Sequence, residues 1–598
     1  MLSSLSIHPI ALWLLLIYGG YVLFLWRWPQ TWLPILLAAL PVLDFAPWTG
    51  QFFFDEFDLL LLLTVITVLA RRGLGELKNT YFGMTTTATA LFWAVGLAGL
   101  VATIMGAWPF PALDSNSFNN YYSPYNALRV GKGLGFALLL LPLLAGDLQR
   151  DADKTFYRIA FGMSLGVLGA GLAVAWERIS MTGLWNFHSG YRVVGLFSGM
   201  HTGGAYIEAY FATAMPFVLW WGIHSRHWAL KLSASLIFLI ACYAMLVTYA
   251  RGGYLALILA SIVLLAGMLP HRSVMQRMRH IFITMLVLLL IGVGLWFSLI
   301  NTPMHWRAGN MQRDMNLRVA HWHQILDIMD QGLPVKLFGM GQGRLPGLYV
   351  QRVPAANISE YRFMREDEHN YLHLTGGDPL YFEQVVDVQP DKLYILKIVV
   401  RSKDPNAELY LPLCQKWMLY PEQCLWKVVK PGDATDWQTF TLSIDTKQLR
   451  DQSWHSRAPR KLSLVNFNDG SVIDIASVSL RAPNGDELIA NGDFAQGMQN
   501  WFFSTENHLP WHFKNLALQL YFEQGWFGLI LMSALLIYSA VILVRRADEK
   551  AFPAALLASA LIGFLTVGMV DSLFDFPRMS IVFYLLVLLI HLREKIES

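Results

Sequence analysis

Charged residues are scarce in this sequence, and their scarcity decides the class of protein. Only 15% of the 598 residues are charged, whereas 55% are hydrophobic. Soluble globular domains carry about 25% charged residues, so this composition excludes an ordinary soluble fold. Apolar runs of about 18 residues or more recur along the chain, and each is long enough to cross the roughly 30 Å hydrocarbon core of a bilayer. The composition therefore predicts a polytopic α-helical membrane protein.

Several catalytic signatures are also missing. The sequence has no Walker A motif, no His/Cys cluster with zinc spacing and no Gly-x-Ser-x-Gly elbow, so ATP-driven transport and serine hydrolysis are without support. The N-terminus lacks a charged start and a small-residue cleavage site, and no cleaved signal peptide is expected. The Asp-Ala-Asp sequence at 151–153 resembles a nucleotide-sugar metal motif, but it falls in a charged cytoplasmic loop and is attributed to chance.

Cysteine is rare, with three residues in the whole chain. Cys242 lies in an apolar helix, where cysteine serves as a small core residue. Cys414 and Cys424 flank a short polar segment in the only large soluble region. If that region lies outside the cytoplasm, the two cysteines form a disulfide; the alternative is a pair of free thiols that are close in sequence.

The apolar runs predict 12 or 13 membrane-spanning helices. They are expected at 10–26, 31–47, 57–70, 86–105, 133–147, 157–176, 203–222, 230–249, 253–269, 281–300, 516–544, 552–570 and 577–593. Lysine and arginine then set the orientation, because cytoplasmic loops carry an excess of both. Under alternating threading, every basic cluster falls on one side, which is therefore cytoplasmic. These clusters include Arg71, Arg72 and Lys78; Arg150, Lys154 and Arg158; Arg272, Arg277 and Arg279; and Arg545, Arg546 and Lys550.

The outward loop 301–513 is large enough to hold a separate domain. Its first part still contains apolar positions at helical spacing. From residue 371 the pattern changes to short alternating strands separated by turns such as DPNA and PNGD, which predicts a β-sandwich. The chain then divides into helices at 1–300, a helical periplasmic loop at 301–370, the β-sandwich at 371–503, and a catalytic segment with the last helices at 504–598.

A polar cluster stands where the helix at 516–544 begins. His508, His512, Lys514 and Asn515 lie directly before that apolar run. Histidine titrates close to physiological pH and serves as a general base, so we predict a base at the outer membrane surface. The alternative is a solvated interfacial histidine beside a snorkelling lysine.

Arginine recurs on the outward face, at Arg192, Arg251, Arg313 and Arg318. Arg251 is the most informative, because it sits in a tight turn between two apolar helices, where a charge is costly without a partner or a task. The planar guanidinium suits phosphate oxygens, so several such residues together would suit a diphosphate. The alternative is interfacial snorkelling.

Carboxylates also gather near outward helix ends, at Asp55, Glu56, Asp58, Asp571 and Asp575. Such groups bind a divalent metal together with a sugar phosphate, which would make a metal-dependent transferase. More often they cap the start of a helix.

Five segments in this order resemble the O-antigen ligase and polymerase superfamily. They are YRVVGLFSGMHTGGAYIEAYFATAMPF at 191–217, YARGGYLALILA at 249–260, NLRVAHWHQILDIMDQGLPVKLFGMGQG at 316–343, HFKNLALQLYFEQGWFGL at 512–529, and the later SLFDFPR. The resemblance covers most of the chain except the strand-rich region. Within that region, ANGDFAQGMQNWFF at 490–503 resembles the opening strand and tryptophan of jelly-roll carbohydrate-binding modules, which implies a jelly-roll-like β-sandwich. Here it comes last, so the final strand leads straight into His512.

The resemblance implies transfer of a glycan from undecaprenyl diphosphate to an acceptor hydroxyl, with inversion and without metal or cofactor. It implies a multi-pass protein of the bacterial inner membrane whose site faces the periplasm, with membrane lipids as partners and no nucleic acid. The acceptor would be a second glycan for a polymerase or lipid A–core for a ligase. A non-enzymatic polysaccharide transporter is the remaining rival, and the absence of a visible internal repeat weakly disfavours it.

The same resemblance assigns roles to individual residues. His512 would be the base, Arg192 and Arg251 would hold the donor diphosphate, and Arg318 would be a weaker candidate for that task. His508, Lys514 and Asn515 would support the site. The family's His-x-His-Asn pattern is altered here, because Lys514 replaces the second histidine. His201 and Thr202 likewise replace the usual Pro-Asn after the first arginine motif. His508 therefore stays open as an alternative base.

Overall fold

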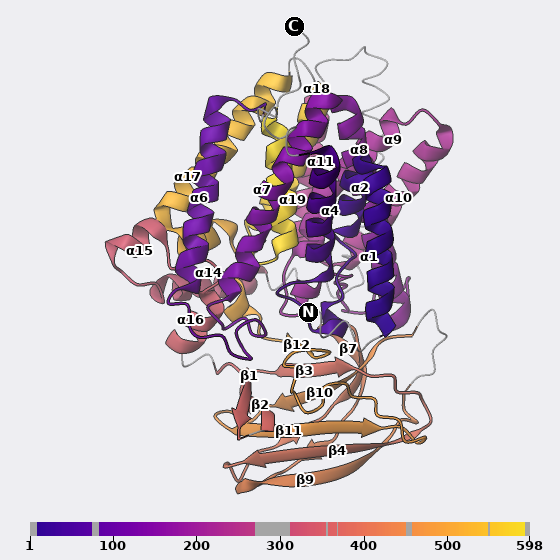
Figure 1. Cartoon of the computed structure of the whole chain (residues 1–598), viewed down its shortest axis with the longest axis vertical. Coiled ribbons are helices and arrows are strands. Elements are labelled where there is room, and N and C mark those ends of the chain that lie inside the picture. The colour runs from indigo at the N-terminus through magenta and orange to yellow at the C-terminus, as the bar shows by residue number, and fades with distance from the viewer. Residues whose placement is uncertain are drawn as a thin grey trace.

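The computed structural model describes residues 9–73, 83–268, 311–353, 357–367, 369–449, 457–547 and 551–592. Long helices pack side by side in one part of the molecule, and a strand-rich region lies beyond one end of them (Figure 1). The predicted fold class, a polytopic helical protein with an inserted β region, is confirmed.

Among the described helices, 5 are long and apolar enough to cross a membrane. They are α6 (Thr86–Ala107), α7 (Asn126–Arg150), α8 (Ala152–Met181), α10 (Trp228–Val247) and the run Leu516–Arg546 of α17. Further helices of the bundle are α1 (Pro9–Arg27), α4 (Glu56–Arg72), α9 (Tyr206–His224), α11 (Arg251–Met268), α18 (Ala551–Gly568) and α19 (Pro577–His591). The helix expected at 281–300 lies outside the described residues, as do Lys78, Lys550 and the cluster Arg272, Arg277 and Arg279.

The single helix expected at 31–47 is wrong. The structure has a 3₁₀ turn, the short helix α2 (Trp32–Ala39) and the four-residue helix α3 (Ala46–Thr49) instead. Pro41 lacks the N–H that would continue the ladder of α2, so the helix stops after 8 residues. A helix of that length rises only about 12 Å and does not cross a bilayer.

The helix expected at 516–544 is present as α17 (Leu516–Ala547), but it is broken at Gly525, where φ is 65° and ψ is −165°. The glycine-rich loop 339–343 fits into this break. Met340 N–H donates to the Phe522 carbonyl at 2.7 Å, and Gly341 N–H donates to the Glu523 carbonyl at 3.2 Å. These bonds satisfy carbonyl groups that the interrupted ladder leaves free. A side chain on Gly339 would lie 2.4 Å from the backbone nitrogen of Gln524, so only glycine permits this approach.

The strand-rich region begins at Tyr361, upstream of the expected boundary at 371, and its last strand, β12 (Phe502–Thr505), ends at Thr505. The two sheets are antiparallel, with 5 and 7 strands. The first, called here the distal sheet, has the order β1-β2-β11-β4-β9; the second, called the proximal sheet, contains β12, β3, β10, β5, β8, β6 and β7. The distal strands are β1 (Tyr361–Glu366), β2 (His369–Thr375), β4 (Leu393–Ser402), β9 (Ala434–Asp445) and β11 (Val472–Arg481). Besides β12, the proximal strands are β3 (Leu380–Val385), β5 (Leu409–Tyr410), β6 (Leu413–Lys416), β7 (Pro421–Leu425), β8 (Val428–Val429) and β10 (Arg460–Asn466). Alternating apolar residues from both sheets, such as Ile398 and Leu464, share one core.

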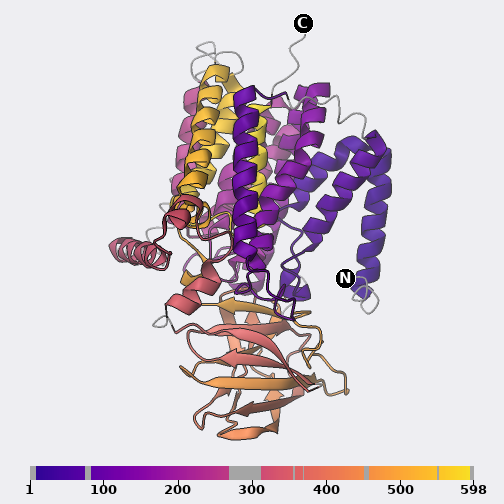
Figure 2. The same cartoon turned by 60° about the vertical axis from the view of Figure 1, so that its left-hand side comes forward.

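The β region is attached to the helical part through the proximal sheet and through β1, the edge strand of the distal sheet. A disulfide joins Cys414 and Cys424, which face each other on β6 and β7. The turn between these strands carries Trp417, which is fully buried against Trp48 and Trp176 and donates to the Gly195 carbonyl at 2.7 Å. Loop 106–130 also contacts this region, because the Asn120 side chain donates to the Tyr361 carbonyl at 2.7 Å. The segments that carry Asn120 and Gly195 therefore meet the β region at one end of the bundle (Figures 1 and 2).

Candidate functional site

His512 lies where the β region returns to the helices. Strand β12 is followed by the 3₁₀ turn Leu509–Trp511, then by His512 and the start of α17. The preceding residue, Trp511, packs on Tyr122 and Phe503, with ring centroids 4.7 Å and 5.4 Å away. His512 itself is buried. Aromatic packing on one side and helix α17 on the other therefore fix the position of this residue.

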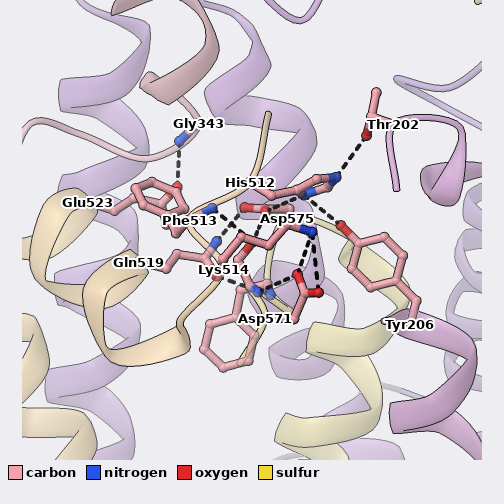
Figure 3. A network of polar contacts seen from close by, with 12 residues as sticks. Thr202, Tyr206, Gly343, His512, Phe513, Lys514, Gln519, Glu523, Asp571 and Asp575 are labelled. Atoms are coloured by element: carbon pink, nitrogen blue, oxygen red, sulfur yellow. Dashed lines mark hydrogen bonds and ion pairs between the residues drawn. The ribbon is translucent and has the colours of Figure 1, made fainter. Parts of the chain in front are cut away.

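The His512 ring has a partner at each nitrogen (Figure 3). Nδ1 lies 3.0 Å from Asp575 Oδ2, and Nε2 lies 2.8 Å from Thr202 Oγ1. The backbone carbonyl of His512 also accepts a bond from His321 Nε2 at 2.8 Å. Since a carboxylate accepts hydrogen bonds, we assign the ring proton to Nδ1 and the lone pair to Nε2. This tautomer presents Nε2 as the basic atom.

Asp575 is itself held in place. Its Oδ2 accepts from Ser572 Oγ at 2.5 Å, and its Oδ1 accepts from Gln519 Nε2 at 2.7 Å. A carboxylate fixed in this way orients a histidine ring and stabilises the imidazolium form. The sequence analysis considered Asp575 only as a metal ligand or helix cap. Its place two residues before Pro577, at the start of α19, held no signal of a histidine 63 residues upstream.

A pocket opens beside the ring. It is lined by Tyr121, Asn126, Arg129, Val130, Gly199, Thr202, Tyr206, Gly343, Leu345, Pro346, Trp511, His512, Phe513, Glu523 and Asp575. Its one arginine is Arg129, which the sequence analysis did not select. Arg129 Nε donates to Asn126 Oδ1 at 2.7 Å, its NH1 donates to the Asp575 carbonyl at 3.0 Å, and its guanidinium covers the Tyr121 ring. Buried arginine in an otherwise apolar helix was the available signal.

On the other side of His512, cationic groups gather. Lys514 is buried and pairs with Asp571 at 3.4 Å. Burial and the nearby arginines lower the pKa of Lys514, although Asp571 opposes them. Lys514 also has a left-handed backbone, with φ of 55°, which is a strained conformation typical of functional sites.

Two of the predicted arginines belong to this cationic group. Arg318 donates to the Val570 carbonyl, next to Asp571. Arg192 donates to the Thr248 carbonyl at 3.0 Å and pairs with Glu208 at 3.2 Å. Both charges act on Lys514. The structure thus brings Arg192, Arg318 and Lys514 together, and we call these three residues the cationic cluster.

His508 lies against the cationic cluster and differs from His512. The charge of Lys514, together with burial and the charges of His512, Arg318 and Arg192, holds the pKa of His508 well below its usual range. The ring packs on Gly203, where an added Cβ would approach it to 3.1 Å. His508 is therefore neutral and weakly basic.

The remaining predicted residues have other surroundings. Arg251 begins α11 and pairs with Asp314 at 2.5 Å, with both side chains partly exposed. Asn515 accepts from the Leu518 N–H at 2.9 Å, which is the bond of an N-terminal helix cap. Arg313 is exposed on α14 (Met311–Asp327).

Asp55 and Asp58 form a capping box at the start of α4. They also pair with Arg578 and Lys132, respectively. This is the helix-capping alternative of the sequence analysis. Among the residues that the structure describes, no group of three or more His, Cys, Asp or Glu side chains is arranged to hold a metal ion.

With this geometry in place, comparison with known proteins adds a family. Residues 236–374 match the family model described as O-antigen ligase. This segment of the chain is similar to O-antigen ligases. The match supports the superfamily predicted from the sequence and a glycosyltransferase activity of O-antigen ligase or polymerase type. No curated protein and no solved structure matches the chain.

The matched segment contains Arg251 and Arg318 and ends at Leu374, inside β2. Arg192 lies before this segment and His512 after it. The apolar helices and the match to the O-antigen ligase family together indicate a multi-pass bacterial membrane protein.

Proposed function

We propose that the protein transfers a glycan from a lipid diphosphate carrier to an acceptor hydroxyl, with His512 as the general base. In the reaction, the acceptor O–H gives its proton to Nε2 of His512 while its oxygen bonds to the anomeric carbon. The bond from that carbon to the diphosphate breaks, and the diphosphate leaves with the electron pair. A single displacement of this kind inverts the anomeric configuration.

The observation that carries this proposal is the pair of contacts on the His512 ring. Asp575 holds Nδ1 at 3.0 Å, and Nε2 points at the Thr202 hydroxyl 2.8 Å away, beside the pocket. The Thr202 hydroxyl occupies the kind of position that an acceptor hydroxyl needs, within hydrogen-bond reach of the basic nitrogen. The resulting imidazolium would be stabilised by the Asp575 carboxylate.

The cationic cluster supports binding of the donor. Arg192, Arg318 and Lys514 lie close enough to His508 for their charges to lower its pKa. Such a group would stabilise the charge that develops on a departing diphosphate, the electrostatic part of the barrier. Arg251 would contribute at the edge of the cationic cluster. Its neighbour Gly252 lies close to Val570, whose carbonyl accepts from Arg318. No metal ion is needed for this role.

The pocket beside His512 supports binding of the acceptor. Arg129 and Glu523 offer charged hydrogen-bonding groups there, and Tyr121 and Trp511 offer aromatic rings. Sugars present both hydroxyl groups and apolar C–H faces, which these two kinds of side chain suit. Donor and acceptor would then approach His512 from opposite sides.

The positions of the basic loops support a location for the site relative to the membrane. Basic loops at one end of the bundle and the site at the other would put His512 at the periplasmic face of the inner membrane. The donor is then an undecaprenyl diphosphate-linked glycan, and the acceptor is a second glycan or lipid A–core.

One incubation tests this function. Purified protein in detergent receives a single undecaprenyl diphosphate-linked oligosaccharide and EDTA, and the products are separated on a gel. A ladder of repeat lengths is the result expected of a polymerase, because the donor then also serves as acceptor. A product formed only after lipid A–core is added identifies a ligase. No transfer under either condition, or transfer that EDTA abolishes, would contradict the proposal.

A further inference from the structure

The outer face of the distal sheet carries a strip of polar and aromatic side chains. In β4, alternate residues such as Ile398 and Val400 are buried in the core, whereas Arg401 points outward and is half-buried. The same alternation in β11 turns Asp474 outward between buried Ile473 and Ile475. The register places Asp474 opposite both Arg401 on β4 and His373 on β2. The strip therefore crosses neighbouring strands.

The members of this strip hold one another in place. Asp474 Oδ1 accepts from His373 Nδ1 at 2.8 Å, and Asp474 Oδ2 accepts from Arg401 Nε at 3.0 Å. The Arg401 guanidinium pairs with Glu366 at 2.7 Å. It also lies over the rings of Trp437, at 4.3 Å, and Tyr371, at 5.2 Å. Pre-organised polar groups beside aromatic rings are the composition of a binding site rather than of a solvated strand face.

Two backbone irregularities flank the strip. The pairing of β4 with β9 shifts between Val400 and Ser402, at Arg401. The pairing of β11 with β4 shifts between Ile475 and Ser477, next to Asp474. Bulges re-aim side chains and are frequent beside functional sites, because regular pairing would otherwise dictate where each side chain points. Here the first bulge lies beside the contact between Trp437 and Arg401.

Within the described residues, the β region docks at other places. Trp417 and β12 of the proximal sheet meet the helices, and Tyr361 on β1, at the edge of the distal sheet, contacts loop 106–130. Strands β11, β4 and β9 lie at the far end of the molecule in both views (Figures 1 and 2).

We propose that the strip formed by His373, Arg401, Trp437 and Asp474, which packs on the buried ring of Tyr371, is a glycan-binding site. It binds an uncharged stretch of the polysaccharide, an assignment that rests on the proposed function for the choice of ligand. The charges favour an uncharged sugar over an acidic one, because the two carboxylates of Asp474 and Glu366 outnumber the single guanidinium of Arg401. Ring faces and fixed hydrogen-bonding groups then supply the contacts. The site would hold a long glycan near the enzyme while its end reaches His512.

The test is affinity electrophoresis of the full-length protein in detergent. Native gels contain soluble glucan, mannan, the surface polysaccharide of the producing cells, or alginate as the acidic member. All binding is measured in a His512→Ala background, so that it does not depend on transfer. We expect at least one uncharged polysaccharide to retard the protein, and Trp437→Ala and Arg401→Ala to reduce the retardation at least about 10-fold, the loss expected when a central contact is removed.

The matched control is Ile395→Ala, because Ile395 is exposed on the same face of β4 but outside the strip. It should bind like the parent. Retardation by none of the uncharged polysaccharides, by alginate alone, or to the same extent in Trp437→Ala would overturn the site. Since transfer is assayed separately with His512 intact, failure of this site and failure of the proposed function give different results.

Discussion

At the residue scale, two histidines four positions apart have opposite surroundings. His508 lies against positive charge and has a pKa well below its usual range, so it holds a proton poorly. His512 lies on the carboxylate of Asp575 and has a hydroxyl at its other nitrogen. A general base must accept a proton, and its protonated form must then be stabilised. A neighbouring carboxylate provides that stabilisation. The contacts therefore favour His512 over His508 as the base.

Substitution of Asp575 tests the orientation of that base. In Asp575→Asn the amide no longer favours a proton on Nδ1, so the basic nitrogen turns away from the acceptor. We expect kcat to fall about 10²- to 10⁴-fold with little change in KM. The check is steady-state transfer by folded protein of unchanged melting temperature. A variant with near-normal kcat would remove Asp575 from the mechanism.

Substitution of Arg192 and Arg251 compares the contribution of the cationic cluster with that of a partly exposed arginine at its edge. Arg192→Lys replaces a planar fork of donors with a point charge, so we expect kcat/KM for the lipid-linked donor to fall about 10- to 100-fold. Arg251→Lys should cost less, because Arg251 is partly exposed and already paired with Asp314. Equal losses in both variants, measured over a range of donor concentrations, would show that the two arginines have the same role.

At the element scale, the break in α17 depends on the loop at 339–343. Gly341 has a φ of 96°, and an added Cβ would lie 2.4 Å from the Gly106 nitrogen. We expect Gly341→Ala to destabilise the protein by about 1–3 kcal/mol and to lower transfer, since both the backbone angle and the contact are lost. The readouts are the melting temperature and kcat.

Gly332→Ala is the matched control, because Gly332 precedes the same loop and an added Cβ would meet only Pro334 Cδ, at an ordinary contact distance of 3.7 Å. It should behave like the parent protein. If Gly341→Ala melts at the same temperature as the control, the close approach of loop 339–343 to the bundle is not a structural requirement.

The elements also show what the sequence could predict. Long apolar runs located α6, α7, α8 and α10, because length and hydrophobicity alone define a spanning helix. The same criterion failed at 31–47 and at Gly525. Hydrophobicity does not register where a proline ends a ladder or where a distant loop supplies the missing hydrogen bonds. Alternation likewise located the strands from residue 371 onward, whereas β1 lies wholly within the segment 301–370 that was expected to be helical.

The site was predictable only in part for a similar reason. His512, Lys514 and the arginines stood out because polar side chains are costly at the edge of an apolar run. Asp575 and Arg129 did not, since their roles arise from pairing across 63 and 446 positions of sequence. Likewise, the register of β2, β11 and β4 brings His373, Asp474 and Arg401 together.

At the scale of the whole molecule, neutral histidines are buried where the β region, the loops and the helices meet. Burial lowers the pKa of His201 to about 3 and that of His321 to about 4. In the unfolded chain both histidines have a pKa of about 6.5. Because the folded values are lower, their contribution is complete above about pH 6.5 and is lost as pH falls towards the folded values.

We therefore expect the free energy of unfolding to fall on acidification from about pH 7 to pH 5, by up to about 1.4 kcal/mol per pH unit for each such histidine. The melting temperature should drop with it. His321→Gln keeps a donor for the His512 carbonyl but does not titrate, so its melting temperature should depend less steeply on pH. Parallel curves for parent and variant would exclude this origin of acid sensitivity.

The assignment of His512 as the general base is tested most directly by comparing the transfer rates of His512→Ala and His508→Ala. Both purified variants are given the same lipid diphosphate-linked oligosaccharide and acceptor in EDTA, with the amount of folded protein matched. We expect the transfer rate of His512→Ala to fall about 10²-fold or more, whereas His508→Ala should keep most of its transfer rate. Full activity of His512→Ala, or loss confined to His508→Ala, would contradict the assignment of His512 as the base.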